Sequence, residues 1–174
     1  MSRRLTFTLM LVLVLGFSLR PALAQREPLN DEEQAYVEKN FPEAKKLITG
    51  VRYVVHKEGT GDTVHAGDKV SVYYKGMLMN GTVFNECAAP AAPFTFRVGR
   101  GEVIAGWDQV LKLFNEGTKA TVVIPYEYAY GTLGNPPAVP RQAMLVFEVE
   151  VLKIERSPYY VPPVPADQGK KKKK

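Results

Sequence analysis

Hydrophobic and polar residues alternate with a period of two over much of the chain between Val51 and Glu155. That period places successive side chains on opposite faces of an extended strand. The last such stretch is the clearest, because Phe147 and Val149 share one face while Glu148 lies on the other. The pattern predicts five or six antiparallel strands, at about 51–56, 69–78, 82–84, 94–98, 118–124 and 144–154.

The dipeptide Asn80-Gly81 separates two of these strands. Asn-Gly is the typical central pair of a two-residue type I′ turn. The sequence therefore predicts a tight hairpin here, with the return strand beginning at Thr82.

Two segments have helical spacing instead. Asn30 with Glu33 three residues later forms a capping-box pattern, and Pro42 is expected to end the helix that begins there. Residues 43–48 are expected to add a further turn. Between 105 and 114, apolar residues recur at spacings of three and four. A sheet with one apolar face must bury that face, and this second helix is the candidate within the domain.

The predicted fold class is therefore α+β. An antiparallel five- to six-stranded sheet wraps around one short helix over residues 51–155, and residues 25–50 form an N-terminal helical extension. The 174 residues suit one domain with appendages.

Both ends of the chain differ from this domain. Residues 1–24 have a charged start of Arg3 and Arg4, an apolar run of about 15 residues and the sequence Ala22-Leu23-Ala24, which together predict a secretory signal peptide cleaved near Ala24. Residues 156–174 are rich in proline and end in five lysines, which predicts a flexible tail. No transmembrane segment is expected in the mature chain.

The net charge of +5 comes from these ends. Without the three arginines of residues 1–24 and the five terminal lysines, 15 basic residues face all 18 acidic ones. The charge therefore gives no support to a nucleic-acid-binding domain, and no nucleic-acid partner is expected.

Motifs for metal, nucleophilic or nucleotide chemistry are missing from the sequence. It has two histidines and one cysteine, Cys87, and it has none of the patterns CxxC, HExxH, GxSxG, GxxxxGK or GxGxxG. No metal and no cofactor are expected. His56 is expected to face solvent, and His65 has no evident partner. Asn80-Gly81-Thr82 is also an N-glycosylation sequon.

Aromatic residues are concentrated beside strand ends and loops. Tyr128 and Tyr130 fall in a loop rich in glycine and proline between Pro125 and Pro140. A phenol there offers an apolar face together with a hydrogen bond. An aromatic-lined pocket with a few polar groups is typical of a ligand site.

Six segments of the chain form a distinctive ordered set: Val72-Tyr-Tyr-Lys-Gly-Met-Leu78, Asn80-Gly-Thr-Val-Phe84, Pro93-Phe-Thr-Phe96, Glu102-Val-Ile-Ala-Gly-Trp107, Ile124-Pro-Tyr-Glu-Tyr-Ala-Tyr-Gly131 and Leu145-Val-Phe-Glu-Val-Glu-Val151. Taken together and in order, they resemble one known family, the FKBP-type peptidyl-prolyl cis-trans isomerases. The resemblance covers Val51 to Glu155, and the family's fold is the sheet-on-helix arrangement predicted above.

The resemblance implies a pocket for a prolyl side chain, with Trp107 as its floor. It also implies ligand hydrogen bonds from the backbone N–H of Ile104 and the phenol of Tyr130. The implied catalytic residues are Tyr74, Phe84, Asn85, Trp107 and Tyr130, and the implied ligand-binding residues are Phe94, Val103, Ile104, Val139 and Phe147.

The function implied is acceleration of Xaa–Pro rotation by desolvation and hydrogen bonding in this pocket. The implied partners are proline-containing folding polypeptides and macrolides such as rapamycin and tacrolimus. With the signal peptide, this predicts a folding helper of the secretory pathway, in the endoplasmic reticulum, the periplasm or outside the cell.

The sequence also departs from the family. Asn85 stands where the family usually has Asp, an Ala-rich segment at 88–92 lacks the usual Arg, and Ala138-Val139 replaces an Ile pair. These changes motivate an alternative, a non-catalytic proline-binding or chaperone module. A further alternative is a surface or adhesion protein acting through the lysine tail.

Overall fold

The computed structural model describes residues 27–161, so the expected signal peptide and residues 162–174 of the expected tail lie outside the described residues. The elements in chain order are α1 (Asp31–Asn40), β1 (Lys45–Lys46), β2 (Arg52–Lys57), β3 (Lys69–Leu78), β4 (Val83–Cys87), β5 (Phe94–Arg97), α2 (Ala105–Val110), the 3-10 turn η1 (Leu111–Leu113), β6 (Lys119–Ile124), the 3-10 turn η2 (Tyr126–Tyr128) and β7 (Leu145–Glu155).

Within this range seven strands form one antiparallel sheet, in the order β1-β2-β6-β7-β3-β4. β5 pairs with the first half of β3 and β4 with its second half, so the segment 88–93 crosses from one to the other along the same edge. The predicted strands are confirmed. β1 is an additional one.

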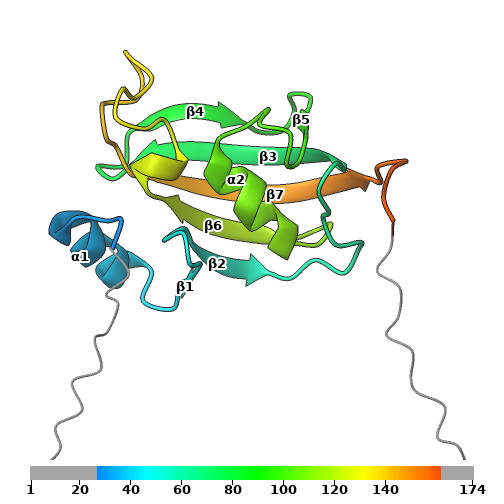
Figure 1. The fold of residues 1–174 in the computed structure, drawn as a ribbon, viewed down its shortest axis with the longest axis horizontal. Helices are drawn as coiled ribbons and strands as arrows, with labels where there is room; N and C mark the ends of the chain where they lie inside the picture. Colours follow the sequence, from blue (N-terminus) through cyan, green and yellow to red (C-terminus); the bar gives the residue numbers. More distant parts are fainter. Residues whose placement is uncertain (1–26, 162–174) are drawn as a thin grey trace, which may run out of the picture.

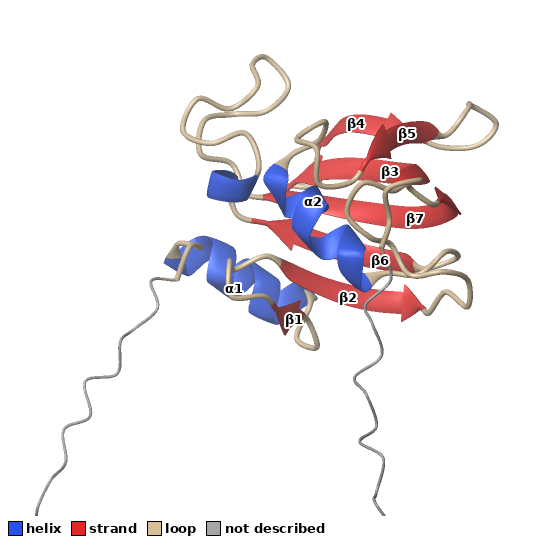
Figure 2. Cartoon of the chain, turned by 45° about the vertical axis from the view of Figure 1, so that its right-hand side comes forward, coloured by secondary structure: helices blue, strands red, loops and turns tan. Residues whose placement is uncertain are grey.

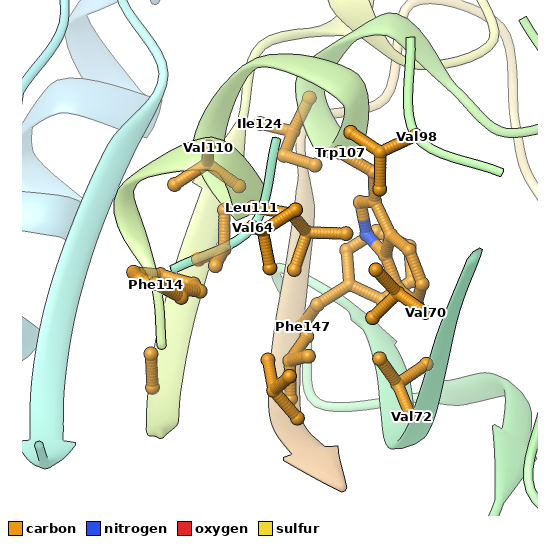
Figure 3. Close-up of a cluster of buried hydrophobic side chains, with 14 of the residues drawn as sticks. Val64, Val70, Val72, Val98, Trp107, Val110, Leu111, Phe114, Ile124 and Phe147 are labelled. Carbon is orange, nitrogen blue, oxygen red and sulfur yellow. The ribbon is translucent and has the colours of Figure 1, made fainter. Parts of the chain in front are cut away.

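The α2–η1 segment lies across one face of the curved sheet (Figures 1 and 2). Trp107, Val110, Leu111 and Phe114 are each at most 4% exposed, and they pack against the apolar faces of the strands. Figure 3 shows the Trp107 indole in this cluster with Phe147 and Val70. The prediction that this segment covers the sheet is confirmed, although the α-helix ends at Val110 and only a 3-10 turn follows.

α1 covers part of the opposite face. Asn30 and Glu33 form the expected capping box: the Asn30 side chain accepts the Glu33 N–H at 2.9 Å and the Glu33 carboxylate accepts the Asn30 N–H at 3.1 Å. Val37 packs on Val123 and Val146, which point away from α2. Those two valines are therefore buried even though they lie on the outer face of the sheet.

The expected helical turn at 43–48 is wrong. Lys45–Lys46 pairs with Arg52–Tyr53 as a short strand. The Gly50 N–H donates to the Leu47 carbonyl at 2.9 Å, and Gly50 has a φ of +85°, so a tight turn reverses the chain here.

The hairpin between β3 and β4 is confirmed, but the type I′ turn is wrong. A type I′ turn needs positive φ at both central residues, whereas Gly81 has φ +85° and Asn80 does not have positive φ. The Gly81 N–H donates to the Leu78 carbonyl, and the Leu78 N–H donates to the Thr82 carbonyl. This pattern is that of a three-residue loop in which a left-handed glycine follows the turn.

The first residues of the expected tail belong to the folded domain. The carboxylate of Asp68, which is fully buried, accepts the Ser157 N–H at 2.9 Å and an Arg156 N–H at 2.5 Å. Tyr160 packs on the His65 ring with 4.4 Å between the ring centres. His65, for which the sequence offered no partner, therefore lies in a cluster that fixes the end of β7.

Candidate active site

A pocket of about 150 Å³ opens beside the start of α2. Its walls come from β3, β4, β5, β7, the segment before α2 and the loop after η2, which converge around α2 (Figure 2). Nine of the ten predicted site residues line it. The lining residues are Tyr74, Phe84, Asn85, Phe94, Glu102, Val103, Ile104, Trp107, Tyr130 and Phe147.

The floor of the pocket is a cluster of aromatic rings around Trp107. The indole lies edge-to-face against Tyr74 and against Phe147, in both cases with 5.2 Å between ring centres. Trp107 is 4% exposed, whereas Phe94 and Tyr130 at the rim are 38% and 36% exposed. The pocket thus has a dry floor and a rim that meets water.

Gly76 of β3 makes room for two of these rings. A Cβ at this position would lie 2.7 Å from Phe84 and 2.8 Å from Phe147, closer than real Cβ contacts. Phe84 and Phe147 themselves meet edge-to-face, with ring centres 5.6 Å apart. The missing side chain at Gly76 is therefore what lets the two rings close one wall of the pocket.

Tyr74 and Asn85 form a polar edge. The Tyr74 hydroxyl donates to the Asn85 Oδ1 at 2.6 Å, which pairs the two side chains. Burial, with smaller contributions from Cys87 and Tyr130, raises the pKa of Tyr74 above its usual 10. The hydroxyl therefore stays protonated at neutral pH and remains a donor.

Ile104 offers a backbone donor at the pocket wall. It is the N-cap residue of α2, and its carbonyl accepts the Trp107 N–H at 2.9 Å. Among the described residues, none accepts the N–H of Ile104. This N–H lies on the lining segment and is free to meet a ligand.

Val139 is the predicted site residue that does not line the pocket. It is 1% exposed and belongs to the core. Its N–H and carbonyl pair with Asn135 at 2.9 Å in each direction, which closes the loop that follows Tyr130. Val139 therefore anchors this loop.

Glu102 was missed by the sequence reasoning. It lines the pocket, and its carboxylate accepts the Arg97 N–H at 2.9 Å. The signal was present, because Glu102 opens one of the six segments that carry the family resemblance.

The lining holds no histidine, cysteine or lysine, and its one acid, Glu102, is already bonded to the backbone. No group of three or more potential metal ligands occurs among residues 27–161. In the same range, no helix is long and apolar enough to cross a membrane.

A larger hollow of about 420 Å³ has walls rich in charged side chains such as Lys75, Glu148 and Glu150. The smaller pocket is the better ligand site, because aromatic rings converge there.

The comparisons with known proteins point to one family. The family model described as FKBP-type peptidyl-prolyl cis-trans isomerase matches residues 61–152. Peptidyl-prolyl cis-trans isomerase FKBP2 of Mus musculus is 50% identical over 116 residues, which cover 64% of this chain and 79% of the mouse protein.

Two further similar proteins are also peptidyl-prolyl cis-trans isomerases. Peptidyl-prolyl cis-trans isomerase Fkbp12 of Drosophila melanogaster is 40% identical over 107 residues, covering 61% of this chain and 99% of the fly protein. The crystal structure of a peptidyl-prolyl cis-trans isomerase from Pseudomonas syringae superimposes with a TM-score of 0.64 at 31% identity, covering 72% of this chain and 92% of that one. The matched residues 61–152 span more than half of the chain and include every residue that lines the pocket. The chain therefore belongs to the FKBP-type peptidyl-prolyl cis-trans isomerases, enzymes that interconvert the cis and trans forms of Xaa–Pro bonds.

Proposed function

We propose that the chain accelerates Xaa–Pro rotation in polypeptides by seating the prolyl ring on Trp107 and removing water from the preceding carbonyl. The observation that carries this mechanism is the pocket itself, which has a dry aromatic floor and no free acid, base or nucleophile. Rotation about an amide breaks no bond and transfers no proton. An apolar pocket without an acid, a base or a nucleophile is therefore sufficient for this reaction.

The energy required is modest. The barrier to rotation is about 18–20 kcal/mol because twisting breaks amide resonance. Resonance places negative charge on the carbonyl oxygen, and a site without water stabilises that charge less well. An acceleration of about 10⁵-fold needs about 7 kcal/mol of differential stabilisation. Desolvation of the carbonyl and one or two hydrogen bonds that favour the twisted geometry together supply energy on this scale.

Two donors at the rim suit the twisted substrate. The Ile104 N–H is free among the described residues, and the Tyr130 hydroxyl lies at the exposed side of the pocket. We assign them to the carbonyl oxygens that flank the rotating bond. Asn85 orients Tyr74 through its 2.6 Å hydrogen bond, because its amide oxygen can accept the hydroxyl proton as a carboxylate oxygen would.

Replacing Tyr130→Phe tests this assignment. It removes the hydroxyl and keeps the ring, so we expect kcat/KM for a short Xaa-Pro peptide to fall by about 2- to 10-fold, since one neutral hydrogen bond contributes about 0.5–1.5 kcal/mol. Tyr128→Phe is the matched control, because Tyr128 belongs to the adjacent 3-10 turn and does not line the pocket. Equal rates for wild type and the Tyr130 variant would contradict the role.

The same pocket suits proline-containing polypeptides and macrolides such as rapamycin and tacrolimus as ligands. An extended polypeptide can enter past the exposed rings of Phe94 and Tyr130. The shared requirement is an apolar ring system that fills the floor, with carbonyl oxygens placed for the donors at the rim.

We further propose that the chain acts in the secretory pathway, after cleavage near Ala24. The sequon at Asn80 allows a test, because the hairpin that carries it is exposed. Expression of the full chain in a glycosylating eukaryotic host is expected to give a product whose mass falls on endoglycosidase treatment. Asn80→Gln is expected to abolish that change. A chain retained in the cytosol with residues 1–24 intact would contradict the proposal, whereas a secreted, cleaved chain without a glycan would show only that Asn80 is not modified.

A further inference from the structure

Asp108, which the sequence reasoning left without a role, holds a loop beside the pocket. Its Oδ1 accepts the Gly99 N–H at 2.7 Å, and its Oδ2 accepts the Gly101 N–H at 3.1 Å. One carboxylate on α2 therefore bonds two backbone donors of the segment that connects β5 to α2.

The middle of that segment, residues 99–103, has few other contacts that would fix it. Gly99 and Gly101 are exposed and have φ values of +74° and +69°, and a Cβ at Gly101 would meet nothing within 4 Å. Glycine has wide conformational freedom, so an exposed segment with two such residues samples many conformations unless it is tied down. The ends of the segment are fixed, because buried Val98 pairs with Asp68 and Gly67 and the Ile104 carbonyl accepts the Trp107 N–H. Between these ends, the one further hydrogen bond among the described residues runs from the Arg97 N–H to the Glu102 carboxylate.

The segment leads directly into the pocket. Glu102, Val103 and Ile104 follow Gly101 and line the wall, and the free Ile104 N–H belongs to this run. Asp108 itself follows Trp107, the floor of the pocket. Its carboxylate thus ties the backbone just before the wall to the helix that carries the floor, and these two hydrogen bonds restrain the wall relative to Trp107.

We propose that Asp108 is a positioning residue for prolyl isomerisation, which fixes the wall formed by residues 102–104 against Trp107. It does not touch the substrate, because it does not line the pocket. It acts through the Ile104 N–H and the side chain of Val103. This inference rests on the proposed function of the pocket, but the position of the wall can be observed without substrate.

The experiment compares Asp108→Ala and Asp108→Asn with a matched control, Glu116→Ala. Glu116 also accepts a backbone N–H through its carboxylate, that of Ile154 at 2.8 Å. Ile154 lies seven residues beyond Phe147 along β7, about 23 Å from the pocket wall. The control therefore removes a bond of the same kind at the other end of the sheet.

The measurements are kcat/KM for an Xaa-Pro peptide, the unfolding midpoint, and amide hydrogen exchange of the free protein. We expect Asp108→Ala to lower kcat/KM by about tenfold, since small displacements of positioning groups cost that much or more. Asp108→Asn keeps one acceptor oxygen, so its kcat/KM should fall less than that of Asp108→Ala. Glu116→Ala should lower the unfolding midpoint by as much as Asp108→Ala does. It should leave kcat/KM within about twofold of wild type, because it displaces no group of the pocket.

Amide hydrogen exchange distinguishes the restraint of the loop by Asp108 from the proposed catalytic function of the pocket. We expect Gly99 and Gly101 to exchange faster in Asp108→Ala and to remain unchanged in Glu116→Ala, whether or not the enzyme turns over. Inactive wild-type protein with this exchange pattern would refute the proposed function and leave the restraint of the loop standing. Equal activity in Asp108→Ala and Glu116→Ala, in the presence of an active wild type, would overturn the positioning role.

Discussion

Trp107→Ala is expected to lower kcat/KM by about 10- to 100-fold, because the prolyl ring loses an apolar contact surface worth about 1.5–3 kcal/mol. The indole is the floor of the pocket and touches Tyr74 and Phe147 on two sides. Its removal also leaves a cavity in the core. The free energy of unfolding should therefore fall by about 3–5 kcal/mol.

The stability loss needs its own control, and the same segment supplies one. Phe114 is 2% exposed, ends the α2–η1 segment, and packs against Tyr53 on the side away from the pocket. Phe114→Ala should destabilise the protein to a similar extent and retain kcat/KM per folded molecule. Trp107→Phe keeps an aromatic floor, so its kcat/KM per folded molecule should lie between those of wild type and Trp107→Ala. If Trp107→Ala and Phe114→Ala show the same activity per folded molecule, Trp107 is only a core residue.

Gly76→Ala is the second substitution with a large expected effect. The added methyl group would enter the space of Phe84 and Phe147, at 2.7 and 2.8 Å, and the backbone of β3 is paired on both sides and cannot retreat. We expect a loss of about 1–3 kcal/mol in the free energy of unfolding, as for other overpacked cores. We also expect kcat/KM to fall by about tenfold, because two rings of the wall are displaced.

A double variant tests the cause. Phe84→Leu shortens one of the two rings, so Gly76→Ala should cost less stability in its presence than in wild type, by the coupling expected for residues in contact. Thermal or denaturant unfolding of the four proteins in this cycle measures the difference. Strict additivity would show that the methyl group does not meet Phe84.

The periodic parts of the fold could be predicted from the sequence. Alternating residues locate the strands, and the spacing of Trp107, Val110 and Phe114 identifies the segment that covers the sheet. Both patterns arise because one face of each element is buried. The start of α1 was also predictable, since Asn30 and Glu33 stand close together in the sequence.

The site residues came mainly from the family resemblance. Reasoning from residue types alone singled out Tyr128 and Tyr130 in the loop. Tyr130 does line the pocket, while Tyr128 packs on the core. A tyrosine in an irregular loop has no period that shows which way it points, so the sequence could not separate the two.

Contacts between a side chain and a distant backbone group leave no pattern in the sequence. The bonds from Ser157 and Arg156 to Asp68 span 89 and 88 residues, and they explain why the chain after β7 is fixed where a tail was expected. The position of Val139 could not be predicted for the same reason. Two backbone hydrogen bonds with Asn135 close its loop, and its side chain lies in the core. Such features depend on the completed fold.

The central claim is that this pocket, with Trp107 as its floor, accelerates rotation about Xaa–Pro bonds. The most direct test is the rate of cis–trans exchange of a short Xaa-Pro peptide, followed by NMR exchange spectroscopy with and without the full chain. Trp107 is the one tryptophan of the sequence, so its fluorescence reports peptide binding in the same samples. We predict saturable acceleration that rapamycin abolishes and that Trp107→Ala largely removes. Peptide binding seen by fluorescence, with exchange still at the uncatalysed rate, would contradict the account.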